Sequence, residues 1–240
     1  MAEIVNTVNL EEIKGKLYEK LKPSGWGDKL KTFIMSDDFD KILRKLLAEV
    51  KDGQRFTPVL KQVFRAFEEC PYKDLKVVMI GRDPYPYQGV SDGIAFSCAN
   101  TGKPEASLRY ILKEVADTVY LEGGSNWDPD LKRWSNQGIL MLNIAFTTTI
   151  GKVGQHYALW QPFLAFLFDT LMYQNPGLIY VFMGKKAQEW ADSIPDNNFK
   201  IFTTHPAFAA HTDAERWDSG DLFNKVSVLV KKQFNEDITW

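Results

Sequence analysis

The stretch KVVMIGRDPYPYQGVSDGIAFSC, residues 76–98, indicates a buried strand followed by a loop, and the rest of the fold is interpreted around it. It opens with Val77–Ile80, a run of β-branched and apolar residues that predicts a buried strand. Gly81 and Pro84 end the strand and place Asp83 on a turn at its carboxyl end. Ligands bind at this edge of open α/β sheets, so the stretch predicts a binding site there.

The composition is that of an ordinary soluble globular protein. Of the 240 residues, 45% are apolar and 25% are charged, and the formal net charge is −2. A DNA-binding role would therefore rest on a local patch, main-chain amides and stacking. The two cysteines have neither disulfide nor metal-ligand spacing, and no signal peptide or membrane-length apolar run is present. These features predict an intracellular, cytoplasmic protein. We also expect a monomer, because no predicted element carries an unmatched apolar face.

Apolar periodicity predicts helices and strands in alternation. Residues 1–70 are expected to form an N-terminal helical segment, with helices over 10–21 and 39–50 and another that starts at Thr57-Pro58. Later strands are expected at 139–142, 178–182 and 200–204, and later helices at 108–119, 160–172 and 222–234. This order predicts one domain over residues 1–240, its core at 71–240. The fold class is α/β, a three-layer α/β/α arrangement around a four-stranded, mostly parallel sheet.

The four predicted strands each end in a chemically useful residue: Asp83, Asn143, Gly184-Lys185 and His205. Parallel strands bring their carboxyl ends to one edge, so these groups are expected to share a site. The pattern lacks paired carboxylates around a water, an activated Ser or Cys nucleophile and clustered metal ligands. We therefore expect neither metal nor cofactor, and a site that recognises a flat ring.

These residues resemble the family 1 uracil-DNA glycosylases. GRDPYPYQGVSDGIAFS aligns without a gap with the family's water-activating loop, whose usual form is GQDPYHGPGQAHGLAFS. Five further blocks follow the family's order over about residues 55–235: FTPVLKQVFRAFEECPYKDLKVVMIG, SLRYILKEV, LKRWSNQGILMLN, VFMGKKAQEW and THPAF. The resemblance implies an enzyme of base excision repair that flips deoxyuridine out of DNA and hydrolyses its N-glycosidic bond.

The resemblance assigns catalytic roles to Asp83 and His205. Asp83 would stabilise the sugar cation and orient the attacking water, and His205 would donate to the uracil O2 as negative charge develops. Taken alone, Asp83 is equally well explained as a loop cap, and a lone His is more often a core residue. Pro86 stands where the family usually has a His that helps to hold the water, although poxvirus members also carry Pro there.

Four more residues would bind the base. Asn143 would read the O4 and N3 edge of uracil and exclude cytosine, and Phe96 would stack on the ring. Tyr85 would clash with the 5-methyl of thymine. Arg82 occupies the family's Gln position, where the main chain is expected to contact the base.

The loops that grip DNA are the weakest part of the resemblance. Only Ser107 remains of a Pro-Pro-Ser segment, and Lys185 replaces the Ser of a Gly-Ser turn. Ala207 and Ala209 replace the family's phosphate-binding Ser and its wedge Leu. The expected DNA-binding residues are Ser107, Gly184, Lys185, Pro206 and Phe208, with Phe208 wedging or stacking. A weakened grip on the duplex predicts a stronger preference for single-stranded DNA.

Two rival interpretations stay open. The first is a DNA- or partner-binding module that keeps the glycosylase fold with little or no activity, although a scaffold has no chemical need for Asp83, Asn143 and His205. The second is a glycosylase with another base specificity, because Pro86–Gln88 departs from the family pattern. The sequence names no protein inhibitor or replication partner.

Overall fold

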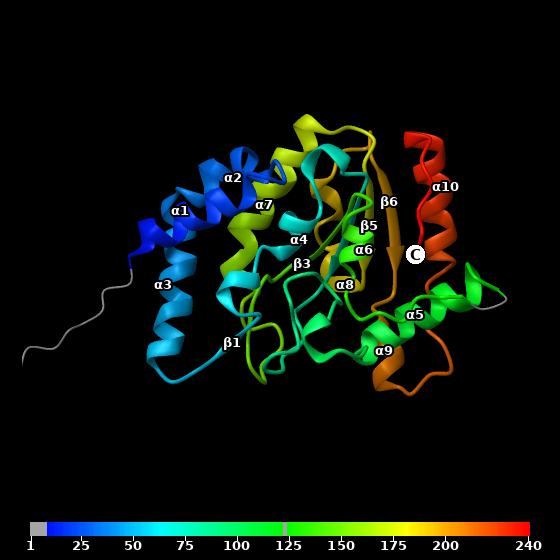
Figure 1. Cartoon of the computed structure of the whole chain (residues 1–240), viewed down its shortest axis with the longest axis horizontal. Helices are drawn as coiled ribbons and strands as arrows, with labels where there is room; N and C mark the ends of the chain where they lie inside the picture. Colours follow the sequence, from blue (N-terminus) through cyan, green and yellow to red (C-terminus); the bar gives the residue numbers. More distant parts are fainter. Residues whose placement is uncertain (1–8, 122–123) are drawn as a thin grey trace, which may run out of the picture.

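The computed structural model describes residues 9–121 and 124–240 and has a parallel sheet at its centre (Figure 1). The four strands lie in the order β3-β2-β5-β6, and each neighbouring pair is parallel. Their bounds are β2 Val77–Gly81, β3 Ile139–Asn143, β5 Ile179–Met183 and β6 Phe199–Thr203. The predicted α/β/α fold is confirmed, and this sheet is entirely parallel.

Burial along the strands follows their place in the sheet. The two central strands, β2 and β5, are buried at every residue, because helices cover both of their faces. Strand β6 lies at the edge and is only partly covered, so that Phe202 is 53% exposed. Phe202 therefore presents an aromatic ring to solvent near the carboxyl ends of the strands.

Helices cover both faces of the sheet. Helix α7, Tyr157–Gln174, packs against α2, Trp26–Ile34, and α3, Asp37–Lys51. Figure 1 shows these three on one side of the sheet, with α5, Ala106–Thr118, and α10, Leu222–Phe234, on the other. The remaining helices are α1 Leu10–Leu21, α4 Arg65–Glu69, α6 Lys132–Ser135, α8 Lys185–Gln188 and α9 Pro206–His211, with short 3₁₀ turns at Leu60–Gln62, Tyr72–Asp74, Ala99–Thr101 and Ala191–Ser193.

Two expectations for the N-terminal segment are wrong. No helix starts at Thr57-Pro58: Phe56–Thr57 forms strand β1, which pairs antiparallel with β4, Thr148–Thr149. The backbone of Phe56 and Thr57 is engaged in this pairing, so the next α-helix begins only at Arg65. In addition, α2 begins at Trp26, where a break was expected, because the indole donates to the carbonyl oxygen of Cys70 at 2.7 Å and so fixes the helix start.

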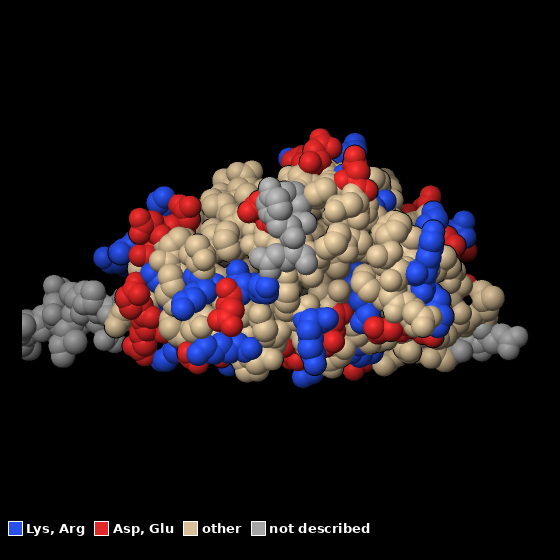
Figure 2. All heavy atoms as spheres, turned by 90° about the horizontal axis from the view of Figure 1, so that it is seen from above, with Lys and Arg blue, Asp and Glu red and all other residues tan. Residues whose placement is uncertain are grey.

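The surface at the amino ends of the strands carries no single sign of charge. Figure 2 views this face, the top of Figure 1, and shows Lys and Arg interspersed with Asp and Glu. Within residues 9–121 and 124–240, no helix has the length and apolarity needed to cross a membrane. The face shown in Figure 2 therefore presents no uniform basic field among its described residues.

Candidate active site

The carboxyl ends of the strands meet at the lower edge of the molecule in Figure 1. Gly81 at the end of β2 is in register with Asn143 at the end of β3, and Met183 of β5 with Thr203 of β6. Asp83 and His205 each follow their strand by two residues. The predicted convergence of Asp83, Asn143, Gly184 and His205 on one edge is confirmed.

Two glycines allow the side chains of the site to approach the main chain closely. A Cβ atom on Gly81 would lie 2.6 Å from Asn143 Oδ1 and 2.9 Å from Phe96 Cζ. A Cβ atom on Gly184, whose φ is +90°, would lie 2.8 Å from the Cβ of His205. The rings of Phe96 and His205 are 5.5 Å apart between centroids, at 47°. One small space is thus surrounded by main chain, the Asn143 amide, the Phe96 ring and the His205 imidazole.

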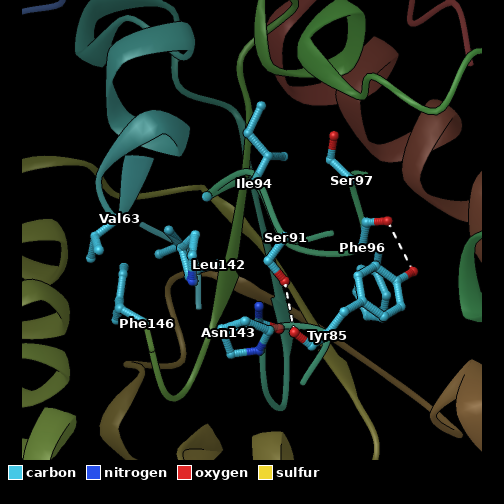
Figure 3. Close-up of a pocket in the computed structure, with 12 residues that line it drawn as sticks. Val63, Tyr85, Ser91, Ile94, Phe96, Ser97, Leu142, Asn143 and Phe146 are labelled. Atoms are coloured by element: carbon cyan, nitrogen blue, oxygen red, sulfur yellow. Dashed lines mark hydrogen bonds between the residues drawn. The ribbon is translucent and has the colours of Figure 1, made fainter. Parts of the chain in front are cut away.

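Phe96 is held in a conformation that aromatic residues rarely adopt. Its φ is +65°, in the left-handed region, which costs roughly 1–3 kcal/mol for a residue other than glycine. The hydroxyl of Tyr85 donates to the carbonyl oxygen of Phe96 at 3.0 Å, and Ser91 donates to the carbonyl oxygen of Tyr85 at 3.3 Å. Figure 3 shows these contacts in a pocket that Asn143 also lines. Strain of this kind, maintained by its neighbours, is common at functional sites.

A buried ion pair between Asp92 and Arg65 stabilises the same loop. Asp92 is fully buried and accepts hydrogen bonds from the main-chain N–H groups of Ile94 and Ala99 and from Ser97 Oγ. Arg65 of α4 lies 2.9 Å from its carboxylate. Asp92 has no distinguishing mark in the sequence, because its partners lie in its own loop and in α4.

The carboxylate of Asp83 accepts hydrogen bonds from three of the described residues. Its Oδ1 accepts the main-chain N–H of Gly154 at 2.8 Å, and its Oδ2 accepts Arg82 Nε at 2.9 Å and the hydroxyl of Tyr157. The side chain is only 4% exposed. Sequence reasoning missed Gly154 and Tyr157, because they lie more than seventy residues away from Asp83 in the chain.

The surroundings of His205 favour a neutral imidazole that can donate a hydrogen bond. Its Nδ1 accepts the main-chain N–H of Ala207 at 3.1 Å, so in the neutral ring the proton resides on Nε2. Burial lowers the pKa of His205 to about 4, with further contributions from Arg82 and His211. Close to neutral pH the ring therefore offers one N–H group and no positive charge.

We expect His205 to remain neutral at pH 6, where an ordinary His is largely protonated. Because the folded protein binds this proton less readily than the unfolded chain, the stability that the neutral ring contributes is present above pH 6.5 and declines toward pH 4. The ¹⁵N shifts of the ring, assigned with a His205→Gln variant, report its protonation. Titration of His205 near pH 6.5 would contradict this prediction.

The predicted DNA-binding residues differ in exposure. Phe208 is 68% exposed, whereas the side chain of Ala209, the expected wedge position, is buried at 3% and has no surface with which to enter a base stack. Lys185 is exposed. Ser107, in the first turn of α5, is 7% exposed, and Pro206 is buried, so neither presents much side-chain surface.

A groove adjoins these residues at the end of the edge strand. Exposed Phe202 of β6 and Phe208 of α9 line it together with Lys185, and His205 and Gly184 form part of its wall. The groove is thus continuous with the site at the strand ends.

The structure thus defines a three-layer α/β/α protein with an acid, an amide, a phenyl ring and a neutral imidazole at the carboxyl edge of its parallel sheet, the edge at which such folds bind ligands. The model of the uracil DNA glycosylase superfamily matches residues 67–227. The chain belongs to this superfamily.

Curated relatives and solved structures agree with this assignment. The chain is 35% identical over 169 residues to the uracil-DNA glycosylase of Chromobacterium violaceum, covering 70% of each chain. It is 29% identical to that of Streptococcus uberis over 92% of this chain and 99% of the relative. The mimivirus uracil-DNA glycosylase structure shares the fold, with a TM-score of 0.82 over 97% of this chain and 89% of that one at 24% identity. A mimivirus variant solved in complex with UGI superposes with a TM-score of 0.79, at 25% identity, over 90% of this chain and 87% of that one.

Proposed function

We propose that this chain excises uracil from DNA by hydrolysing the N-glycosidic bond of a flipped-out deoxyuridine. The observation that carries the proposal is the meeting of Asp83, Asn143, Phe96 and a neutral His205 at one sheet edge. The superfamily membership and relatives named uracil-DNA glycosylase support it. A target inside a duplex is out of reach of such a site, so the nucleotide must leave the stack.

The proposed chemistry separates two charges. As the bond from the sugar C1′ to the base N1 breaks, its electron pair goes to the base and positive charge develops on the sugar. His205 Nε2–H would donate to the uracil O2, where the negative charge gathers, and the Asp83 carboxylate would lie opposite the cation. Water then adds to C1′ and releases a proton, which neutralises the departing uracil anion through solvent, so that the products are uracil and an abasic site.

Base selection would rest on Asn143, Phe96 and Tyr85. The amide of Asn143 has both a donor and an acceptor and so matches the N3–H and O4 edge of uracil. Phe96 supplies a face for stacking. Burial raises the pKa of Tyr85 well above 10, so its hydroxyl stays protonated and bound to the carbonyl oxygen of Phe96, where the ring is fixed as a steric block.

We further propose that single-stranded DNA is the preferred substrate. Ala209 is buried and cannot support the displaced base, which leaves Phe208 as the protruding apolar side chain of this loop. The exposed rings of Phe202 and Phe208 would stack on unpaired bases, and Lys185 would neutralise a phosphate. UGI, which binds the mimivirus variant, is a useful probe of whether a protein inhibitor competes for these loops.

Uracil release in EDTA from matched single- and double-stranded oligonucleotides tests the proposal. Because unstacking costs a few kcal/mol per step, we expect release from the single strand to be roughly tenfold to a hundredfold faster. A Phe208→Ala variant should lose rate on the duplex and bind the single strand less tightly.

Equal rates on the two substrates would refute the strand preference and leave uracil excision standing. If no uracil-containing substrate is cleaved, excision itself is refuted and a binding module becomes the better interpretation. Release of hypoxanthine or of 5-substituted uracils in the same assay would instead reveal a different base specificity.

A further inference from the structure

Both oxygens of the Asp83 carboxylate are held by one short segment far away in sequence. Gly154 donates its main-chain N–H to Oδ1 at 2.8 Å, and Tyr157, the first residue of α7, donates its hydroxyl to Oδ2. The only other donor to Asp83 among the described residues is Arg82, its neighbour in the chain, whose side chain is 41% exposed. The segment from 154 to 157 therefore sets the direction of the carboxylate more firmly than the loop itself.

Tyr157 differs from Arg82 in the charge that it brings. A guanidinium beside Asp83 offsets part of the negative charge that would face the sugar cation, whereas a phenol orients the carboxylate and leaves its charge in place. Burial, together with the hydrogen bond to Asp83, raises the pKa of Tyr157 far above 10. Tyr157 thus acts as a hydrogen-bond donor throughout the neutral range, not as a base.

The position of Tyr157 is itself fixed from two sides. Its ring lies against Gly154, where a Cβ atom would come within 3.0 Å of the ring carbon Cε2, and Gly154 has a φ of +77°. The preceding residue, His156, is 1% exposed, and its Nε2 lies 3.1 Å from the carboxylate oxygens of Glu49 in α3. The N-terminal helices are thereby connected through His156 and Tyr157 to Asp83.

We propose that Tyr157 is a positioning residue for excision, which holds the Asp83 carboxylate in the orientation that faces the developing sugar cation. The inference rests on the proposed glycosylase function and deepens it. Tyr157 forms no bond to the substrate and transfers no proton. Its effect should appear in the rate of the chemical step and not in DNA affinity.

The test is single-turnover release of uracil from a single-stranded oligonucleotide by Tyr157→Phe, with enzyme in saturating excess. Removal of a hydrogen bond to a charged group is expected to slow release roughly tenfold to a hundredfold, while the Kd for the oligonucleotide stays unchanged. Tyr180→Phe is the matched control. The buried hydroxyl of Tyr180, in β5, has no hydrogen-bond partner among the described residues, and its loss should leave the rate unchanged.

A double-variant cycle separates positioning from a general structural effect. If Tyr157 acts through the carboxylate, Tyr157→Phe will slow wild type but add little to the defect of Asp83→Asn. An equal loss of rate in both backgrounds, or a rate for Tyr157→Phe within twofold of wild type, would overturn the inference while uracil excision stands. Absence of release by wild type would overturn the proposed function and this inference together.

Discussion

Asp83→Asn will release uracil about a thousandfold more slowly than wild type. Two unit charges 4 Å apart interact by about 4 kcal/mol at an effective dielectric constant of 20, and a carboxylate facing a sugar cation loses that attraction when it becomes an amide. Each 1.36 kcal/mol is worth tenfold in rate. The N–H₂ group of the amide would also face either the N–H of Gly154 or Arg82 Nε, so one accepted hydrogen bond becomes a contact between two donors.

The measurement is single-turnover release from a single-stranded uracil oligonucleotide at pH 7, with the Kd determined separately. The variant should bind the oligonucleotide as tightly as wild type, since the proposed role of Asp83 arises only as charge develops. Thermal unfolding of the variant shows whether the fold is kept. A rate within tenfold of wild type would exclude Asp83 as the residue that stabilises the cation.

Most of the sheet and its edge could be predicted from local patterns. The apolar run Val77–Ile80 needed only the Gly and Pro after it to be placed as a strand that delivers Asp83 to a turn. The terminal helix and the first helix were predicted at their observed bounds, Leu222–Phe234 and Leu10–Leu21, because each has a clear apolar face. In these elements local preference and tertiary packing favour the same structure.

The wrong expectations lie where distant backbone decides the local structure. Phe56–Thr57 reads as the start of a helix, yet its partner is Thr148–Thr149, more than ninety residues further along the chain. Trp26 reads as part of a break between helices, and only the hydrogen bond to Cys70 shows why a helix begins there. Contacts of this range leave no periodic signal in the sequence.

The candidate site likewise contains residues that the sequence reveals and residues that only distant contacts reveal. Asp83, Asn143 and His205 stand at strand ends and are recognisable by position and type. Tyr157 has no such mark, because its role depends on a contact with Asp83, 74 residues away. The exposure of Phe208 and the burial of Ala209 are equally invisible in the sequence, which shows only two apolar residues side by side.

Glu49→Ala will lower the free energy of unfolding by about 1–3 kcal/mol, the cost of leaving the buried polar groups of His156 and Thr149 without the carboxylate that they bind. Glu49 is 4% exposed and His156 is 1% exposed, with Nε2 of the ring 3.1 Å from both carboxylate oxygens. Thr149 donates to the same carboxylate at 3.1 Å. Domains of this kind have only about 5–15 kcal/mol of stability in all, so the variant should unfold at a much lower urea concentration.

The matched control is Glu12→Ala, which removes an exposed surface pair with Lys16 and should leave the urea midpoint unchanged. Burial alone would raise the pKa of Glu49, but the nearby His156 and the hydrogen bonds from His156 and Thr149 lower it below its usual value. The stability that this carboxylate contributes is therefore present above its unfolded pKa and is lost as the pH falls through the lowered one. The difference between wild type and Glu49→Ala should accordingly shrink in acid. A loss below 1 kcal/mol at pH 7, or a difference that persists in acid, would show that the pair does not anchor the segment carrying Tyr157.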